Sequence, residues 1–212
     1  MQVLMLDDHE MFLQGLKNLL GTISPGLQID ISSNVAHAAQ LTSLRAYDLV
    51  LLDWHLADCD GAEAMQRLRD VGCAARIVVL SGETSTALIR RTVELGAAGF
   101  IPKTYSSEML VSALDKVLGG RVFLPAEGLA TAAVPPTQTD LEHDPRFAGL
   151  TSRQIDVYRA AARGLPNKLI ARELGIAEST VKTHLSAVFA QLGVRNRTEA
   201  AFQASRDGLR IA

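Results

Sequence analysis

The sequence predicts an α/β fold followed by an all-α region. In residues 1–120, short apolar runs alternate five times with helical patterns, which is typical of a doubly wound (βα)5 fold with a parallel five-stranded sheet. From residue 148 onward only helical patterns occur, and they predict four helices. The intervening residues are small or polar and include Pro135-Pro136, as in a linker. We therefore expect domains at 1–120 and 148–212, joined by a linker at 121–147.

The five expected strands are apolar runs bounded by polar or turn residues. They cover residues 3–6, 27–31, 49–52, 77–80 and 100–101. Their near-continuous apolar character is typical of parallel strands that are buried on both faces of a sheet.

The helices expected between these strands have recognisable ends. They cover residues 10–20, 35–44, 61–71, 86–95 and 108–118. Gly21, Gly96 and Gly119 are expected to end three of them, and Ser107 is expected to cap the start of the last.

Composition argues against several protein classes. No apolar run reaches 18 residues, so no membrane span or membrane partner is expected. The first residues lack the pattern of a secretory signal. Cys59 and Cys73 lack metal-ligand spacing and fit a reducing compartment, so the cytoplasm is expected.

Charge is divided unevenly along the chain. Residues 1–120 hold 9 Lys and Arg against 14 Asp and Glu, whereas residues 148–212 hold 10 against 5. A basic second region makes nucleic acid a candidate partner.

Polar residues follow four of the strands. They are Asp7 and Asp8, Asp53, Ser81 and Gly82, and Lys103. Because ligands of parallel sheets bind at the carboxyl ends of the strands, these residues are expected to form one site. Three crowded carboxylates need a cation or a proton, and an oxygen-rich acidic site suits Mg²⁺. A lone Asp after a strand is often only a helix cap, so the prediction depends on the combination.

This combination resembles the receiver domain of bacterial response regulators, a flavodoxin-like fold, over about residues 1–120. The resemblance implies that Asp53 accepts a phosphoryl group and that Asp8 binds Mg²⁺ directly. It implies that Asp7 holds metal-bound water and that the backbone carbonyl of His55 is a further ligand. It also implies that Ser81 and Phe100 form a conformational switch. Lys103 would pair with the phosphoryl group, and Gly82 would leave room for that group beside Ser81. His9, after the acid pair, is interpreted as a helix-start residue and not as a ligand.

Two other interpretations stay open. A magnesium phosphatase of the haloacid-dehalogenase type also uses a strand-end Asp, but it needs a second Asp two residues later, where His55 stands here. A regulator that works without phosphorylation would not need the three acids and Lys103. In the response-regulator interpretation, the receiver would catalyse its own phosphorylation and slow hydrolysis, and the chain is not expected to be an enzyme in its own right.

The second region carries the signals of a helix-turn-helix. Thr151 and Gln154 fit a capping box at the first helix, which is expected to end near Gly164. The next helices are expected at 167–174, 179–192 and 196–208. Gly175 suits the turn between the second and third helices, and apolar residues every three or four positions line one face of the third.

The segment "NKLIARELGIAESTVKTH" is similar to the DNA-binding domain of NarL/FixJ/LuxR-type regulators. This resemblance implies that the third helix enters the major groove and that the fourth helix serves dimerisation. The residues expected to contact DNA are Asn167, Lys168, Arg172, Ser179, Thr180, Lys182, Thr183, His184, Ser186, Arg195 and Arg197. Of these, Lys182 is expected to read bases and the arginines to bind phosphates, while the helix position of His184 favours packing.

The whole chain is thus expected to be a two-domain response regulator of the NarL/FixJ family. A sensor histidine kinase would phosphorylate Asp53, and the chain would bind double-stranded DNA as a homodimer.

Overall fold

The computed structural model describes residues 1–125 and 145–206. In the first part, five parallel strands form one sheet in the order β2-β1-β3-β4-β5. The strands are β1 (Gln2–Leu6), β2 (Gln28–Ser32), β3 (Leu49–Asp53), β4 (Arg76–Ser81) and β5 (Gly99–Pro102). The predicted doubly wound (βα)5 fold is confirmed.

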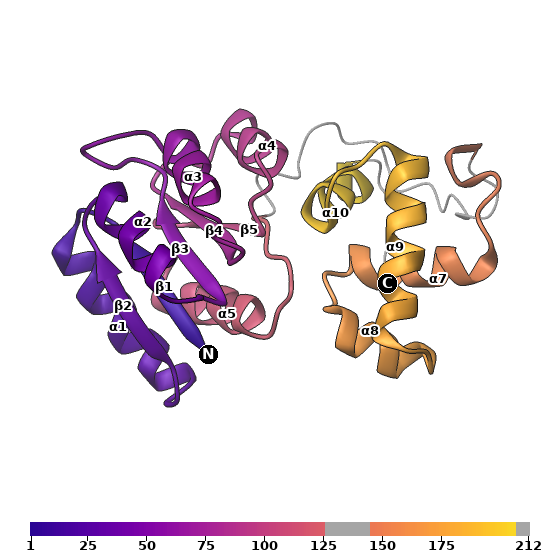
Figure 1. The fold of residues 1–212 in the computed structure, drawn as a ribbon, viewed down its shortest axis with the longest axis horizontal. Helices are drawn as coiled ribbons and strands as arrows, with labels where there is room; N and C mark the ends of the chain where they lie inside the picture. The colour runs from indigo at the N-terminus through magenta and orange to yellow at the C-terminus, as the bar shows by residue number, and fades with distance from the viewer. Residues whose placement is uncertain (126–144, 207–212) are drawn as a thin grey trace.

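Helices cover both faces of this sheet (Figure 1). They are α1 (Glu10–Ile23), α2 (Val35–Leu44), α3 (Gly61–Asp70), α4 (Thr86–Glu94) and α5 (Ser107–Leu118). Side chains of α1 and α5 pack on one face around Met5 and Leu51, and side chains of α2, α3 and α4 pack on the other around Leu4 and Val79. Successive side chains of a strand therefore point to opposite faces of the sheet, and helices bury both faces. This explains why the strands are continuous apolar runs.

Two predicted helix ends are wrong. The first helix continues through Gly21 to Ile23, because Gly21 keeps a helical backbone and Ser24 ends the helix instead. The cap of α5 is Ser106, whose hydroxyl accepts a hydrogen bond from the Met109 amide, and not Ser107. Ser106 and Ser107 are adjacent serines that are both able to cap a helix, whereas Gly21 and Ser24 lie three residues apart.

The second part is helical from η2 (Pro145–Phe147) onward. Its α-helices are α7 (Ser152–Ala162), α8 (Asn167–Leu174), α9 (Glu178–Leu192) and α10 (Arg197–Arg206). The capping box of Thr151 and Gln154 is present, and Gly175 takes the left-handed conformation at the turn between α8 and α9. Gly208, expected to end the last helix, lies outside the described residues, as does the middle of the expected linker.

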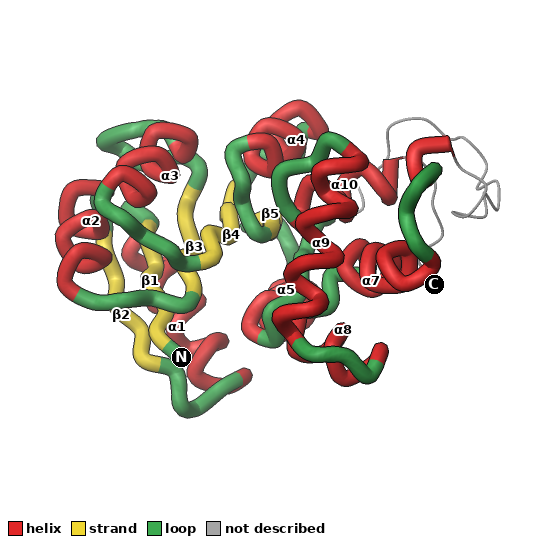
Figure 2. The backbone as a smooth tube through the Cα atoms, turned by 45° about the vertical axis from the view of Figure 1, so that its right-hand side comes forward, coloured by secondary structure: helices red, strands yellow, loops and turns green. Residues whose placement is uncertain are grey.

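The two parts of the chain touch through α4 and α10, which lie side by side in both views (Figures 1 and 2). Phe202 of α10 is only 7% exposed and belongs to the same apolar cluster as Ile89 and Val93 of α4. Before the gap, the carbonyl of Phe123 accepts a hydrogen bond from the Phe100 amide at the free edge of β5. Among the described residues, no helix is both long enough and apolar enough to cross a membrane.

Trp54, the single tryptophan, packs directly against the first residue of α3. A Cβ atom on Gly61 would lie 2.3 Å from Trp54 Cε3 and 3.0 Å from the Trp54 backbone. We expect Gly61→Ala to lower the free energy of unfolding by roughly 1–3 kcal/mol, because the overpacked indole must shift. Urea denaturation followed by Trp54 fluorescence measures this change.

Gly15 offers a matched control for that substitution. It is exposed inside α1, and a Cβ atom added there would meet nothing within 4 Å, so Gly15→Ala is expected to raise stability by about 0.5–1 kcal/mol. Equal effects of the two substitutions would contradict the packing of Trp54 described above.

Candidate functional site

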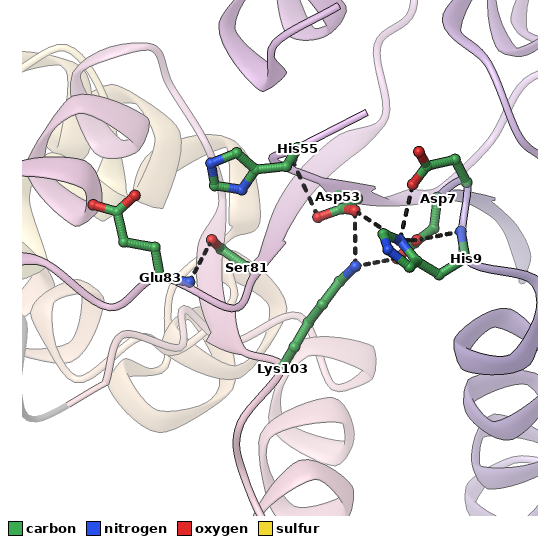
Figure 3. Close-up of polar contacts among 8 residues, drawn as sticks. Asp7, His9, Asp53, His55, Ser81, Glu83 and Lys103 are labelled. Atoms are coloured by element: carbon green, nitrogen blue, oxygen red, sulfur yellow. Dashed lines mark hydrogen bonds and ion pairs between the residues drawn. The ribbon is translucent and has the colours of Figure 1, made fainter. Parts of the chain in front are cut away.

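The carboxyl ends of β1 and β3 bring three carboxylates together. Ligand atoms of Asp7, Asp8, His9 and Asp53 all lie within 4.8 Å of one another (Figure 3). The side chains of Asp7 and Asp53 are only 1% and 3% exposed. The sheet therefore gathers the acids at one buried point, as expected when β1 and β3 are neighbours.

Lys103 reaches this point from the end of β5. Its Nζ lies 2.6 Å from Asp7 Oδ2 and 2.8 Å from Asp53 Oδ2, and it also lies over the ring of Phe12. These contacts place one cation among three acids, so the site keeps an excess of negative charge.

Burial raises the pKa of Asp53 above its usual range. Lys103 opposes this shift by hydrogen bonding and charge, while the neighbouring Asp7 adds to it. Because the pKa is raised, Asp53 by itself stabilises the folded state at pH values below its unfolded-state pKa, and this contribution is lost as the pH rises through the folded-state pKa. A bound cation would favour the ionised form.

A cavity of about 440 Å³ opens beside the acids. Its lining residues are His9, Met11, Phe12, Asp53, His55, Gly82 and Lys103. The amide of His55 donates to Asp53 Oδ1 at 3.3 Å, so the backbone that carries the expected carbonyl ligand is adjacent to the acceptor.

The expected switch residues are buried close behind this cavity. Ser81 and Phe100 are both 0% exposed. The Ser81 hydroxyl accepts a hydrogen bond from the Glu83 amide at 3.0 Å (Figure 3), and the Ser81 carbonyl accepts one from the Lys103 amide. Ser81 is thus tied to the loop that leads into α4 and is not among the cavity-lining residues.

The sequence does not predict where the His9 side chain lies. His9 does stand at the start of α1, but its side chain makes no capping hydrogen bond. Instead its Nδ1 lies 3.0 Å from Asp7 Oδ1 and 2.9 Å from Asp8 Oδ1. The one feature of the sequence that could have indicated this position is that His9 directly follows Asp7 and Asp8 at the end of a strand.

The second part presents a polar face on α9. Lys182, Thr183, Ser186 and Ser179 are exposed, and Thr180 and His184 are partly buried. On the opposite side Val181, Leu185 and Val188 are buried against the neighbouring helices. Lys168 and Arg172 of α8 are exposed, and Asn167 is partly buried. The face predicted to meet DNA is therefore not covered by the first part of the chain.

The two arginines near α10 differ in their surroundings. Arg195 is exposed and pairs with Glu199. Arg197 is partly buried and donates to the Leu165 carbonyl and to Asn167 Oδ1. Burial, and secondarily the nearby Arg76, lower the pKa of Arg197 to about 10. Because these contacts engage its guanidinium within the chain, Arg197 would have to release them to bind a phosphate.

The chain is similar to known proteins over both of its parts. Residues 3–115 match the response regulator receiver domain, and residues 148–204 match the luxR family of bacterial regulatory proteins. The transcriptional activator protein ExaE of Pseudomonas putida is 31% identical over 213 residues, covering 100% of both chains. The nitrate/nitrite response regulator protein NarL of Escherichia coli K12 is 32% identical over 202 residues, covering 94% of this chain and 92% of that one. The crystal structure of a LuxR family DNA-binding response regulator from Silicibacter pomeroyi shares 34% identity and a TM-score of 0.50, covering 58% of this chain and 96% of that one.

Proposed function

Because this chain belongs to the NarL/FixJ family of transcriptional response regulators, which join a receiver domain to a LuxR-type DNA-binding domain, we propose that phosphorylation of Asp53 controls its action on DNA. A sensor histidine kinase supplies the phosphoryl group, and residues 148–212 bind double-stranded DNA as a homodimer in the cytoplasm. The observation that carries the proposal is the buried Asp53 carboxylate, which meets Lys103 and two further acids beside an open cavity.

The acid cluster fits a divalent cation. Asp7 Oδ2 and Asp53 Oδ2 are buried oxygens that pair with the Lys103 ammonium group, and the buried Asp8 Oδ1 lies 2.9 Å from His9 Nδ1, so three carboxylates share a single lysine. Such hard oxygen donors suit Mg²⁺, which Asp8, Asp53 and the His55 carbonyl would hold directly and Asp7 through water. When bound, Mg²⁺ would offset the repulsion between the carboxylate and the anionic phosphoryl group.

The chain's own residues then do three things in the transfer. A carboxylate oxygen of Asp53 attacks the phosphorus, and the bond from phosphorus to the kinase imidazole breaks. Lys103, already 2.8 Å from Asp53, pairs with an oxygen of the transferred group. Ser81 donates its hydroxyl to another oxygen after it gives up its contact with the Glu83 amide, which couples the phosphoryl group to the loop before α4. In this proposal the receiver modifies its own Asp53 with a phosphoryl group taken from the kinase, and it does not act on another substrate.

Removal of the direct metal ligand gives a prediction about cation binding. Asp8→Ala is expected to weaken Mg²⁺ binding at least about 10-fold, because one of few protein ligands is lost. The measurement is a Mg²⁺ titration followed by the fluorescence of Trp54, the residue next to Asp53. Asp70→Ala, an exposed acid on α3, is the control that should titrate like the wild type. Identical curves for Asp8→Ala and the wild type would contradict the assignment.

Phosphorylation is expected to favour a dimer through α10. In the structure one face of α10 packs against α4, so a dimer that uses this face requires the contact to open. We expect sedimentation velocity with beryllium trifluoride, a phosphoryl mimic, to show a dimer for the wild type and a monomer for Asp53→Asn. The same oligomer for the wild type with and without the mimic would argue against this link.

The regulatory proposal as a whole is tested in cells. Genome-wide mapping of DNA sites should give discrete peaks for the wild type under the inducing condition and reduced occupancy for Asp53→Asn. Equal occupancy for both proteins would favour a regulator that works without phosphorylation.

A further inference from the structure

The chain that follows α5 turns back along the free edge of β5. Gly120, in the left-handed conformation with a φ of 81°, reverses the chain after the helix. The carbonyl of Phe123 then accepts a hydrogen bond from the Phe100 amide at 2.8 Å. The two backbones come so close that a Cβ atom on Gly99 would lie 3.0 Å from the Phe123 oxygen. Residues 121–124, the edge segment, therefore cover an edge whose amides would otherwise lack partners in the sheet.

The edge segment is anchored in both apolar layers of the first part. Phe123 packs in the cluster formed with α1 and α5, and Leu124 packs in the cluster formed with α2, α3 and α4. The ring of Phe123 meets Tyr105 edge to face, with ring centroids 6.2 Å apart, and Lys116 Nζ lies 5.4 Å from the Phe123 centroid. Neighbouring side chains thus point to opposite faces of the sheet, as they do in a strand.

The same segment supports the turn between α7 and α8 of the second part. A Cβ atom on Gly164 would lie 3.1 Å from the Val122 nitrogen and 3.2 Å from the Val122 oxygen. Just before the segment, a Cβ atom on Gly120 would lie 3.2 Å from Pro166 Cβ. These contacts do not involve α4 or α10, so the two parts of the chain touch at a second place.

The hydrogen bond of the edge segment lies on a residue of the expected switch. Phe100 is buried, and its amide is the donor to Phe123. Lys103, three residues later, pairs with Asp53, and the Lys103 amide donates to the Ser81 carbonyl at 2.7 Å. A shift of β5 when a phosphoryl group engages Lys103 would therefore act directly on the edge segment.

We propose that the edge segment is a clamp. While it lies on β5 it holds the turn between α7 and α8 against the first part, and phosphorylation of Asp53 releases it through Phe100. The inference rests on the proposed function and adds a device by which the two parts separate. Because the clamp is a two-state element that the phosphoryl group biases, the coupling is reciprocal, and a chain whose clamp is open binds a phosphoryl mimic more tightly.

Hydrogen exchange of single amides, followed by nuclear magnetic resonance in the full chain, tests the release. Beryllium trifluoride with Mg²⁺ should speed exchange of the Phe100 amide about 10-fold or more in the wild type and leave it unchanged in Asp53→Asn. The Ala98 amide, which donates to the Ile77 carbonyl at 2.6 Å, is the internal control and should exchange alike in all samples. Unchanged or slower exchange at Phe100 in the wild type would overturn the inference, as would equal acceleration of both amides.

Two matched pairs of glycines test whether the segment holds the second part. Gly120 and Gly72 each follow a helix of the first part, with φ of 81° and 82°, but a Cβ atom would contact the second part at Gly120 and would meet nothing within 4 Å at Gly72. Gly164 and Gly149 have φ of 80° and 90°, and a Cβ atom would contact the edge segment at Gly164 and would meet nothing within 4 Å at Gly149. Alanine brings similar backbone strain to both members of a pair, so the difference within a pair reports the contact between the two parts.

Small-angle X-ray scattering of the unphosphorylated full chain measures the separation. Gly120→Ala and Gly164→Ala should each raise the radius of gyration by roughly 2 Å or more, because a chain whose parts separate is less compact, while Gly72→Ala and Gly149→Ala should match the wild type. The first two variants should also bind beryllium trifluoride about 5-fold more tightly than their controls. Equal radii within both pairs would mean that the segment only covers the edge of the sheet, and would overturn the inference.

Thermal unfolding verifies that each variant is folded. Because Gly120 and Gly164 lie in different parts of the chain, a folding defect in one variant leaves the other pair as the test.

The clamp and the proposed function can fail separately. If the wild type takes up phosphoryl groups on Asp53 but shows no change at the Phe100 amide and no difference within the glycine pairs, the inference fails while the proposed function stands. If the wild type takes up no phosphoryl group, the clamp has no trigger, and both fail.

Discussion

Asp53→Asn is expected to abolish stable phosphorylation by acetyl phosphate or by a partner kinase. The amide cannot form the acyl phosphate, and in the structure it would keep the place of the carboxylate between Lys103 and His55. The fold should tolerate the change, because loss of a buried carboxylate with a raised pKa removes a group whose ionised form is disfavoured.

The measurement is incorporation of labelled phosphate per chain. The wild type should approach one group, and Asp70→Asn on the exposed end of α3 should do the same. A labelled Asp53→Asn protein with wild-type stoichiometry would refute the assignment of the acceptor.

Lys182→Ala should reduce binding to the specific DNA site by about 1–3 kcal/mol and relax preference at one or two base pairs. Lys182 is exposed on the polar face of α9, early in the helix, where its ammonium group can reach the O6 and N7 acceptors of guanine. Nothing in the first part of the chain covers this face in the structure.

Arg172→Ala provides the contrast. Arg172 is exposed on α8 and is expected to bind a phosphate, so its loss should weaken binding to all sequences and reduce the salt slope by about 1. Both variants are measured on specific and scrambled DNA across a salt series. If Lys182→Ala lowers both affinities by the same factor, its role in reading bases is wrong.

Arg197→Ala is a less suitable comparison for Lys182→Ala than the sequence alone suggests. Its guanidinium donates to Leu165 and Asn167, so its removal would loosen the start of α8 as well as change charge. An effect of Arg197→Ala on DNA binding would therefore mix stability with phosphate contact.

The sequence is sufficient to predict the sheet and the residues at its rim. Buried parallel strands are marked by continuous apolar runs, and the residue after each run lies at the carboxyl edge whatever the details of packing. Asp7, Asp53 and Lys103 converge for that reason, although they are far apart in the chain. The turn at Gly175 is equally visible, because a left-handed residue between two helices favours glycine.

Other features depend on the folded surroundings and leave no local signal. The direction of the His9 side chain is set by the turn after β1, and the inward position of Arg197 is set by the carbonyl of Leu165. Likewise, Phe202 reads as an ordinary apolar residue of α10, and only the folded chain places it against Ile89 of α4. At Gly21 the local signal is present but misleading. Glycine often ends a helix, but here the helix continues past it to Ile23.

The most direct test of Asp53 as the acceptor is to trap and locate the phosphoryl group in the wild type. Sodium borohydride reduces an aspartyl phosphate to homoserine, and mass spectrometry of the peptides identifies the reduced position. After treatment with acetyl phosphate and Mg²⁺, we predict homoserine at position 53 and nowhere else. Reduction at Asp7 or Asp8 instead, or phosphorylated protein with an unreduced Asp53, would contradict this assignment.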